Sequence, residues 1–209
     1  MSGGIDSTIA AILLKKQNYN LVGLTFKPYS DNLTPNSKDN SEKTVEEAIK
    51  VAKLLNIEHH VIDINDEFNK YVISNFISEY LNGNTPNPCV TCNKYIKWGL
   101  LYKKALELGC TKIATGHYAN IINKDGRYFL SKGVDSTKDQ TYFLWQRTQE
   151  QLSNTIFPLG HLTKEKVKQI AIDNGYIKLS KKRESQEICF IPNDNYRDFL
   201  ETHIKDIHN

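Results

Sequence analysis

Short apolar runs alternate with helical patterns along the first half of the chain, and this alternation limits the possible fold more than any other feature. Three apolar runs have the length of buried strands, at residues 21–26, 57–64 and 112–115. Apolar residues recur at helical spacing around them, at residues 5–16, 44–55, 66–81 and 91–108. Strands that alternate with helices are typical of a parallel sheet with helices on both faces, so we predict an α/β fold.

Local signals place the connections between these elements. Residues 27–43 are polar and contain two prolines, which predicts a loop. Thr44 and Glu47 have the spacing of a capping box, so we expect the second helix to begin there. Beyond Gly116 the pattern becomes a hairpin, with an Asp-Gly turn inside residues 119–131. Shorter helices are expected at residues 140–146 and 164–174.

The segment Ser-Gly-Gly-Ile-Asp-Ser, residues 2–7, leads into the first helix and is typical of a phosphate cradle. Glycine lets successive backbone N–H groups point at one anion, while the hydroxyls of Ser2 and Ser7 and the helix N-terminus favour negative charge. The spacing matches neither the P-loop nor the dinucleotide fingerprint. The alternative is an ordinary glycine turn that caps a helix.

Asp6 indicates a cation at this cradle. A carboxylate repels a phosphate unless a cation lies between them, so Asp6 predicts Mg²⁺ and with it a nucleotide. A phosphate loop in such a sheet follows a strand, whereas this loop begins at the second residue. We therefore expect the first strand of the sheet to be missing.

Composition excludes some classes of protein. The 209 residues are 39% hydrophobic and 24% charged, without a long apolar run, so we expect a globular chain with no membrane span. Met1 leads directly into the polar loop without a leader pattern, which predicts a cytoplasmic protein. The net charge of +3 neither requires nor excludes a nucleic-acid partner.

Two of the four cysteines stand in a proline-rich segment before a helix. We expect Cys92 in the first turn of that helix, where the helix dipole and Lys94 would lower the pKa of the thiol. Half of a zinc site is the alternative for the pair that it forms with Cys89. Cys110 and Cys189 are isolated, and each taken alone is typical of buried filling.

Polar residues also follow the third strand. Gly116 would let a nucleotide approach the backbone, and His117 is either a base or a residue that orients the loop. Lys138 and Gln140 precede an aromatic helix, where the lysine either contacts phosphate or lies in a solvated turn. Cys189 lies in an apolar, strand-like segment at residues 184–191.

Five motifs occur in one order along the chain: SGGIDS, TPNPCVTCNKYIKW, ATGHYA, KDQTYFLW and SQEICFI. Together they resemble the tRNA-uridine 2-sulfurtransferases of the PP-loop ATP-pyrophosphatase superfamily. The first motif alone is shared with several synthetases, whereas all five in order are specific. The resemblance implies a Rossmann-like ATP-binding catalytic domain over residues 1–162. It further implies the start of a central tRNA-binding region over residues 163–209, with the C-terminal β-barrel of the family absent.

The same resemblance implies a reaction. A Mg²⁺-ATP enzyme adenylates the C2 oxygen of the wobble uridine, position 34 of the tRNA, and replaces it with sulfur. Cys189 would carry the persulfide, supplied by a donor protein such as a cysteine desulfurase or a relay, and Cys92 would be the nucleophile that releases the sulfur; a disulfide bond is among the expected features.

Further site residues are carried over from the family motifs. The ATP site would contain Met1, Ser2, Gly3, Gly4, Ile5, Asp6, Ser7, Phe26 and Gly116. The target base would meet Asn87, Pro88 and Cys89, and the tRNA would contact Lys138, Asp139 and Gln140.

Position 89 departs from the pattern of the family, in which many relatives carry Asp. Cys89 is a possible acid or base, or a third thiol that holds an iron–sulfur cluster with Cys92 and Cys189. Two other functions remain open. The chain is either another adenylating PP-loop ligase, which needs no paired thiols, or a noncatalytic tRNA-binding fragment.

Overall fold

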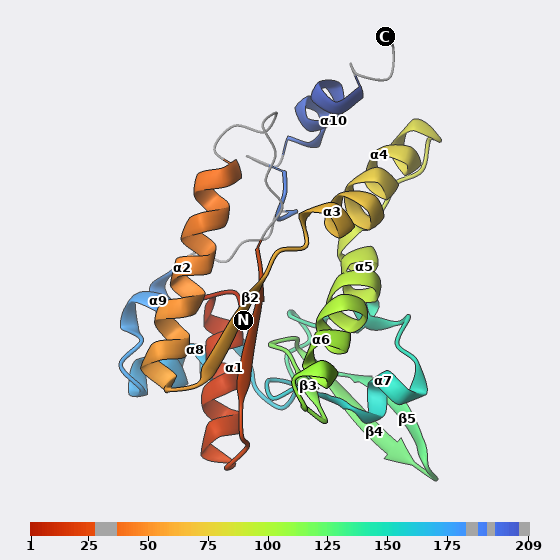
Figure 1. The fold of residues 1–209 in the computed structure, drawn as a ribbon. Helices are drawn as coiled ribbons and strands as arrows, with labels where there is room; N and C mark the ends of the chain where they lie inside the picture. The colour runs from red at the N-terminus through yellow and green to blue at the C-terminus, as the bar shows by residue number, and fades with distance from the viewer. Residues whose placement is uncertain (28–36, 183–187, 192–194, 205–209) are drawn as a thin grey trace.

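The structure is a computed structural model that describes residues 1–27, 37–182, 188–191 and 195–204. Parallel strands flanked by helices dominate it, which confirms the α/β class (Figure 1). Strand β1 (Val22–Phe26) pairs in parallel with β2 (Glu58–Ile62), and β3 (Ile113–Ala114) pairs in parallel with β6 (Thr155–Ile156). The predicted hairpin consists of β4 (Ala119–Lys124) and β5 (Arg127–Lys132).

The helices of the described part begin with α1 (Ile5–Lys16), α2 (Ser37–Leu55), α3 (Asn65–Phe68), the π-helical segment η1 (Asn69–Ile73) and α4 (Ser74–Leu81). They continue with α5 (Pro88–Cys92), the π-helical segment η2 (Asn93–Leu101), α6 (Tyr102–Glu107), the 3₁₀ helix η3 (Thr141–Leu144), α7 (Gln149–Ser153), α8 (Lys164–Asp173), α9 (Ile177–Lys181) and α10 (Tyr196–Ile204). Helices α3 to α4 and α5 to α6 each form one continuous rod with a π-helical middle.

Helix boundaries differ from the sequence prediction in two places. Helix α2 begins at Ser37 rather than Thr44, because residues 37–43 contain no proline and include helix-forming Lys and Glu. Helix α5 begins at Pro88 rather than residue 91, since the side chain of Asn87 accepts a hydrogen bond from the Val90 N–H at 3.2 Å. The predicted capping box was therefore wrong, and the cap of α5 was missed.

The predicted strand at residues 184–191 was also wrong where the structure describes it. Residues 188–191 form a turn, in which the Ile191 N–H donates to the Ile188 carbonyl at 3.0 Å. Residues 184–187 lie outside the described residues. The apolar run therefore serves packing rather than strand pairing, because Phe190 and Ile191 are buried while the backbone turns.

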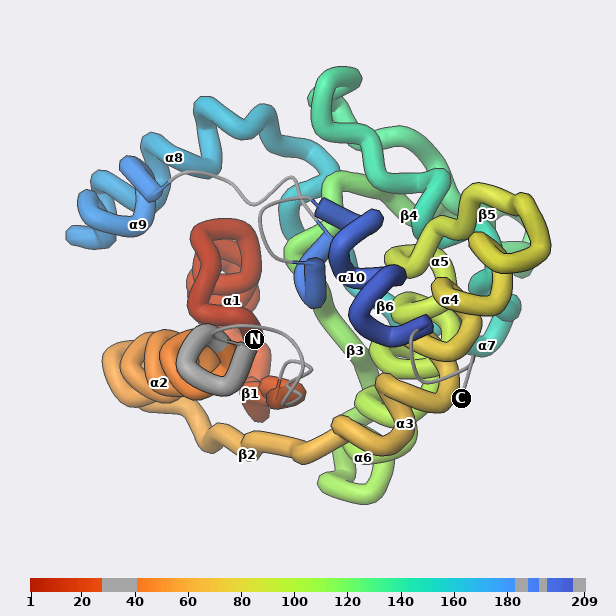
Figure 2. The backbone as a smooth tube through the Cα atoms, turned by 90° about the horizontal axis from the view of Figure 1, so that it is seen from above, coloured from red at the N-terminus to blue at the C-terminus, as the bar shows by residue number. Residues whose placement is uncertain are grey.

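Two apolar clusters hold the elements that carry the predicted site. In the first cluster, α1 lies between α2 and α8 (Figure 2), and Ile9, Val51 and Val167 are buried together. In the second, Phe68, Phe76, Cys92, Phe190 and Phe199 pack together. Each fully buried large apolar side chain contributes roughly 1.5–3 kcal/mol. Helix α8 thus shares a core with α1; the domain boundary after residue 162 stays a prediction.

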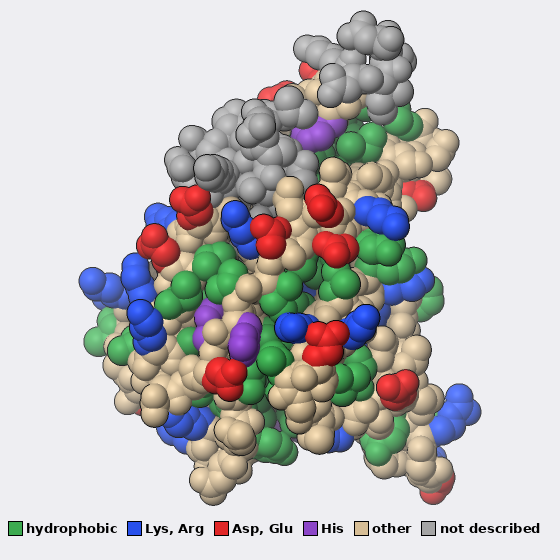
Figure 3. Space-filling model, viewed as in Figure 1, with side chains coloured by type: hydrophobic (Ala, Val, Ile, Leu, Met, Phe, Trp, Pro, Cys, Tyr) green, Lys and Arg blue, Asp and Glu red, His purple; other side chains and the backbone are tan. Residues whose placement is uncertain are grey.

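The surface carries charges of both signs. On the face shown in Figure 3, basic and acidic side chains are interspersed, in keeping with a net charge of only +3. Over the described ranges, no helix is both long enough and apolar enough to cross a membrane.

Candidate active site

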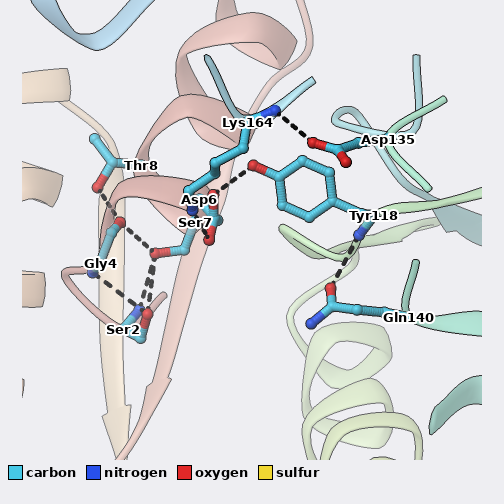
Figure 4. Close-up of polar contacts among 9 residues, drawn as sticks. All are labelled: Ser2, Gly4, Asp6, Ser7, Thr8, Tyr118, Asp135, Gln140 and Lys164. Atoms are coloured by element: carbon cyan, nitrogen blue, oxygen red, sulfur yellow. Dashed lines mark hydrogen bonds and ion pairs between the residues drawn. The ribbon is translucent and has the colours of Figure 1, made fainter. Parts of the chain in front are cut away.

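The loop at residues 2–7 is organised as a cradle by its own hydroxyls (Figure 4). The Ser2 and Ser7 hydroxyls lie 3.2 Å apart, and the Ser7 hydroxyl donates to the Gly4 carbonyl at 3.1 Å. Gly4 caps α1 without a side-chain hydrogen bond, and the helical ladder begins where the Thr8 N–H donates to the Gly4 carbonyl at 3.1 Å. The first N–H groups of α1 are therefore available to an anion.

Close contacts leave no room for a side chain at two glycines, one in this loop and one packed against it. Gly3 has φ +67°, and a Cβ there would lie 2.7 Å from the Cβ of Glu47 on α2. A Cβ at Gly116 would lie 2.7 Å from the backbone carbon of Asp6 and 2.9 Å from the Ser7 nitrogen. Gly116 therefore packs against the N-terminus of α1. The backbone that approaches Gly116 in the structure belongs to the residue 2–7 loop.

In the structure, the cation beside Asp6 is the ammonium group of a lysine (Figure 4). The Lys164 ammonium lies 2.8 and 2.9 Å from the two carboxylate oxygens of Asp6, and the Tyr118 hydroxyl donates to one of them at 2.8 Å. Lys164 is the first residue of α8, where Asp135 accepts its backbone N–H at 2.9 Å. Sequence reasoning missed Lys164 and Tyr118, because the contact joins residues 158 positions apart.

The contacts of Asp6 with Lys164 and Tyr118 leave this carboxylate little capacity to bind the predicted Mg²⁺. A carboxylate offers about four acceptor positions, and three are used by Lys164 and Tyr118. Mg²⁺ is commonly held by one or two carboxylates together with phosphates and water. Asp6 therefore fits a Mg²⁺ that is held mainly by the nucleotide, and would contribute at most one oxygen.

Cys92 belongs to the second apolar cluster, against which the segment of Cys189 also packs. Cys92 is buried in it beside Phe190, the neighbour of Cys189, while Cys89 and Cys189 are exposed. Desolvation by the surrounding protein, and then the thiols of Cys92 and Cys89, raise the pKa of Cys189 to about 12. Burial, and then the nearby Cys89, raise the pKa of Cys92. All four cysteines are free thiols.

The predicted activation of Cys92 was wrong on two points. Cys92 lies at the end of α5, not in its first turn, where Cys89 stands. Burial outweighs the opposing charge of a nearby lysine, so the pKa of Cys92 is raised rather than lowered. The cation that opposes this rise is Lys97, whereas exposed Lys94 lies over the Tyr95 ring at 5.0 Å.

Two metal sites were predicted at the thiols. Within the described ranges, no group of three or more His, Cys, Asp or Glu side chains is placed to hold a metal ion. The iron–sulfur cluster on Cys89, Cys92 and Cys189 and the zinc site at the C-x₂-C pair stay predictions.

The other ATP-site residues of the prediction lie at several places. Met1 runs beside β1: its ammonium donates to the Leu24 carbonyl, and its carbonyl accepts the Thr25 hydroxyl at 2.7 Å. Burial and then Lys97 lower the pKa of the Met1 ammonium to about 5. Ile5 is buried in the first cluster, and Phe26 ends β1 against the second.

The residues predicted to meet the base and the tRNA divide into two groups. Asn87, Pro88 and Cys89 stand together at the start of α5. Gln140 exchanges hydrogen bonds with the backbone of Tyr118 at 3.0 and 3.1 Å, so its amide positions the loop. Asp139 accepts the Thr141 hydroxyl at 2.7 Å, and the Lys138 N–H donates to the Asp135 carbonyl at 3.1 Å.

An aromatic pair that sequence reasoning did not single out lies next to these residues. Tyr142 and Trp145 are 65% and 63% exposed. The spacing within KDQTYFLW offered a signal, because a short helix that buries Leu144 must turn some neighbouring rings outward.

Residues 1–193 match the family model described as "tRNA methyl transferase HUP domain". The chain belongs to this family. Similar proteins include tRNA-specific 2-thiouridylases MnmA from three organisms. The Amoebophilus asiaticus protein is 49% identical over 99% of this chain and 56% of its own length. The Cytophaga hutchinsonii protein is 46% identical over 96% of this chain and 55% of its own length. The Syntrophomonas wolfei protein is 47% identical over 98% of this chain and 57% of its own length. The chain spans about half the length of these curated relatives.

Proposed function

We propose that this HUP-domain chain catalyses the ATP-dependent 2-thiolation of uridine in tRNA. The observation that carries the proposal is that Cys92 shares an apolar cluster with Phe190 and Ile191, which belong to the segment of Cys189. An adenylating ligase needs the cradle but has no use for such thiols.

The cradle supports the activation step. A carbonyl oxygen is a poor leaving group, so the C2 oxygen of uridine first attacks the α-phosphorus of ATP and displaces pyrophosphate. Oriented N–H groups of the cradle stabilise the negative charge that develops on the departing pyrophosphate. Mg²⁺, when bound with the nucleotide, would neutralise phosphate charge, with Asp6 as its protein ligand.

The exposure of the two cysteines supports their separate roles. Exposed Cys189 is accessible to a sulfur donor protein, whereas buried Cys92 is shielded from one. The outer sulfur of a Cys189 persulfide attacks C2, and AMP leaves with the original oxygen. The Cys92 thiolate then attacks the inner sulfur, so that 2-thiouridine departs and a Cys92–Cys189 disulfide forms. An external dithiol restores both thiols, as cycles of this kind require.

The partners of the proposal follow from the surface and the relatives. Position 34 of tRNA is the proposed target, with Asn87, Pro88 and Cys89 at the base. Exposed Tyr142 and Trp145 offer stacking surfaces beside Lys138, an arrangement typical of single-stranded nucleic-acid binding. We also propose that the two parallel strand pairs belong to one Rossmann-like sheet.

The test is product analysis with matched cysteine variants. The chain is incubated with tRNA, Mg²⁺-ATP, a cysteine desulfurase and cysteine, and the nucleosides are identified by mass spectrometry. We expect 2-thiouridine from the wild type and from Cys110→Ser, which changes a thiol outside the cluster, and none from Cys92→Ser or Cys189→Ser. Unchanged product from Cys189→Ser would contradict the proposal. In a parallel incubation with S-adenosylmethionine as methyl donor, a methylated nucleoside would instead favour the methyl transfer named in the family description.

A further inference from the structure

A chain of hydrogen bonds joins the two ligand-binding segments of the proposed site (Figure 4). It begins at Gln140, in the segment that is proposed to contact tRNA, and it ends at Asp6 in the phosphate cradle. Tyr118 connects them, because its backbone bonds to Gln140 and its hydroxyl bonds to Asp6. These contacts join residues that are 22 and 112 positions apart in the sequence.

The bond between Tyr118 and Gln140 runs in both directions. The Tyr118 N–H donates to Gln140 Oε1 at 3.0 Å, and the Gln140 N–H donates to the Tyr118 carbonyl at 3.1 Å. Two such bonds fix the orientation of the two segments as well as their distance. Figure 4 shows the NH₂ group of Gln140 directed away from Tyr118, so this side chain can contact RNA without releasing Tyr118. An RNA that holds Gln140 therefore also restrains the backbone of Tyr118.

The buried ring of Tyr118 carries this restraint to the cradle. Tyr118 is 3% exposed and belongs to the first apolar cluster, so its ring has little freedom to move separately from its backbone. Its hydroxyl donates to a carboxylate oxygen of Asp6 at 2.8 Å. A hydrogen bond to an ionised acceptor is stronger than one between neutral groups. Asp6 lies in the first turn of α1, where the N–H groups available to phosphate also stand.

The loop that holds Tyr118 touches the cradle at a second point. Gly116 packs so closely there that a Cβ would lie 2.7 Å from the backbone carbon of Asp6 and 2.9 Å from the Ser7 nitrogen. One short loop thus meets the start of α1 through both a side-chain hydrogen bond and a backbone contact. The directions of the N–H groups on which phosphate binding depends are therefore set partly by the order of this loop.

We propose that Tyr118 couples the binding of tRNA to the binding of ATP. Both ligands require the same loop to be ordered, so the ligand that binds first orders it and the second binds more tightly. Linkage makes this effect equal in both directions. Tyr118 acts through Gln140 and Asp6, so it is a positioning residue. The proposal rests on the proposed function, because it takes tRNA and ATP as the ligands.

The test is calorimetry with both ligands and two matched variants. The nucleotide is α,β-methylene-ATP with Mg²⁺, whose bridging carbon prevents transfer of the adenylate. Its affinity is measured with and without saturating tRNA, and the affinity of tRNA is measured with and without the analogue. Tyr118→Phe keeps the ring and removes the hydroxyl. Tyr176→Phe is the control, because it removes a hydroxyl from another tyrosine that packs against the first cluster. Circular dichroism verifies that each variant is folded.

We expect each ligand to tighten the other about five- to tenfold in the wild type and in Tyr176→Phe. In Tyr118→Phe this factor should fall below about two, while the affinity for each ligand alone changes less than about twofold. Coupling from direct contact between the two ligands would survive the substitution, so the part that is lost is the part carried by the hydroxyl. Hydrogen exchange gives a second readout: tRNA alone should slow exchange in the peptide of residues 1–12 in the wild type but not in Tyr118→Phe.

Two results would overturn the proposal. One is a coupling factor in folded Tyr118→Phe that equals that of the wild type. The other is independent binding of the two ligands to the wild type, which leaves the proposed function standing. Full coupling without formation of 2-thiouridine would instead refute the proposed function alone, and failure of either ligand to bind the wild type would refute both.

Discussion

The ion pair between Asp6 and Lys164 leads to an asymmetric prediction for stability. The Lys164 side chain is 4% exposed and that of Asp6 is 34% exposed. Breaking a buried pair by removing one partner costs about 3–5 kcal/mol, whereas exposed pairs are worth about 0–1 kcal/mol. Asp6→Asn strands the more deeply buried charge, so we expect it to lower the free energy of unfolding by about 3 kcal/mol. Lys164→Met leaves a carboxylate that water and Tyr118 still reach, and should cost about 2 kcal/mol.

A double-mutant cycle in urea at pH 7 measures the pair itself. The variant with both substitutions removes both charges, so its loss should be smaller than the sum of the single losses by about 2 kcal/mol. Lys182→Met is the matched control, because Lys182 and Glu47 form a pair whose side chains are 51% and 32% exposed. That control should change stability by less than about 1 kcal/mol. Additive losses, or a larger loss from Lys164→Met than from Asp6→Asn, would refute the reasoning.

Three further outcomes are expected. Gly116→Ala should weaken ATP binding at least tenfold in calorimetry, because the added methyl would meet the Asp6 backbone at 2.7 Å; unchanged affinity would show that the loop tolerates displacement. Trp145→Ala should weaken tRNA binding by about 1–3 kcal/mol if a base stacks on it, while Tyr19→Ala, which removes another exposed ring, should not. Because the pKa of His117 is lowered in the folded chain, its contribution to stability is present above pH 6.5 and lost as pH falls. The urea midpoint should therefore drop from pH 7 to pH 5, less so in folded His117→Phe, and an equal drop in both proteins would count against this assignment.

Local sequence patterns predicted the secondary-structure elements, whereas the contacts within the candidate site depend on residues far apart in the sequence. The parallel strands, the hairpin and the cradle were predictable because each depends on neighbours in the sequence. The Asp125-Gly126 turn is an example, since its φ values of 51° and 77° are those that an Asp-Gly pair adopts readily. Lys164 was not predictable, because a lysine at a helix start normally lies in water, and only the packing of α8 on α1 brings it to Asp6.

The predictions for the thiols also succeeded where they depended on local sequence and failed where they depended on long-range contacts. The cysteines were identified from the sequence, but the expected pKa of Cys92 had the wrong sign because the depth of burial depends on Phe190 and the rest of the second cluster. Lys94 was chosen as the cation because it is two residues from Cys92. The cation that opposes the rise in pKa is Lys97, which stands in a π-helical segment that no propensity scale signals.

The pairing of Asp6 with Lys164 also makes the cradle electrically balanced before any nucleotide arrives. One negative and one positive side chain cancel, so what attracts the phosphate is a set of oriented backbone dipoles at the start of α1 rather than a surplus of charge. Dipoles act over short distances and depend on direction. Ionic strength should therefore affect nucleotide binding much less than it affects tRNA binding, which is governed by counterion release. The two substrates of one reaction would then respond differently to the salt around them.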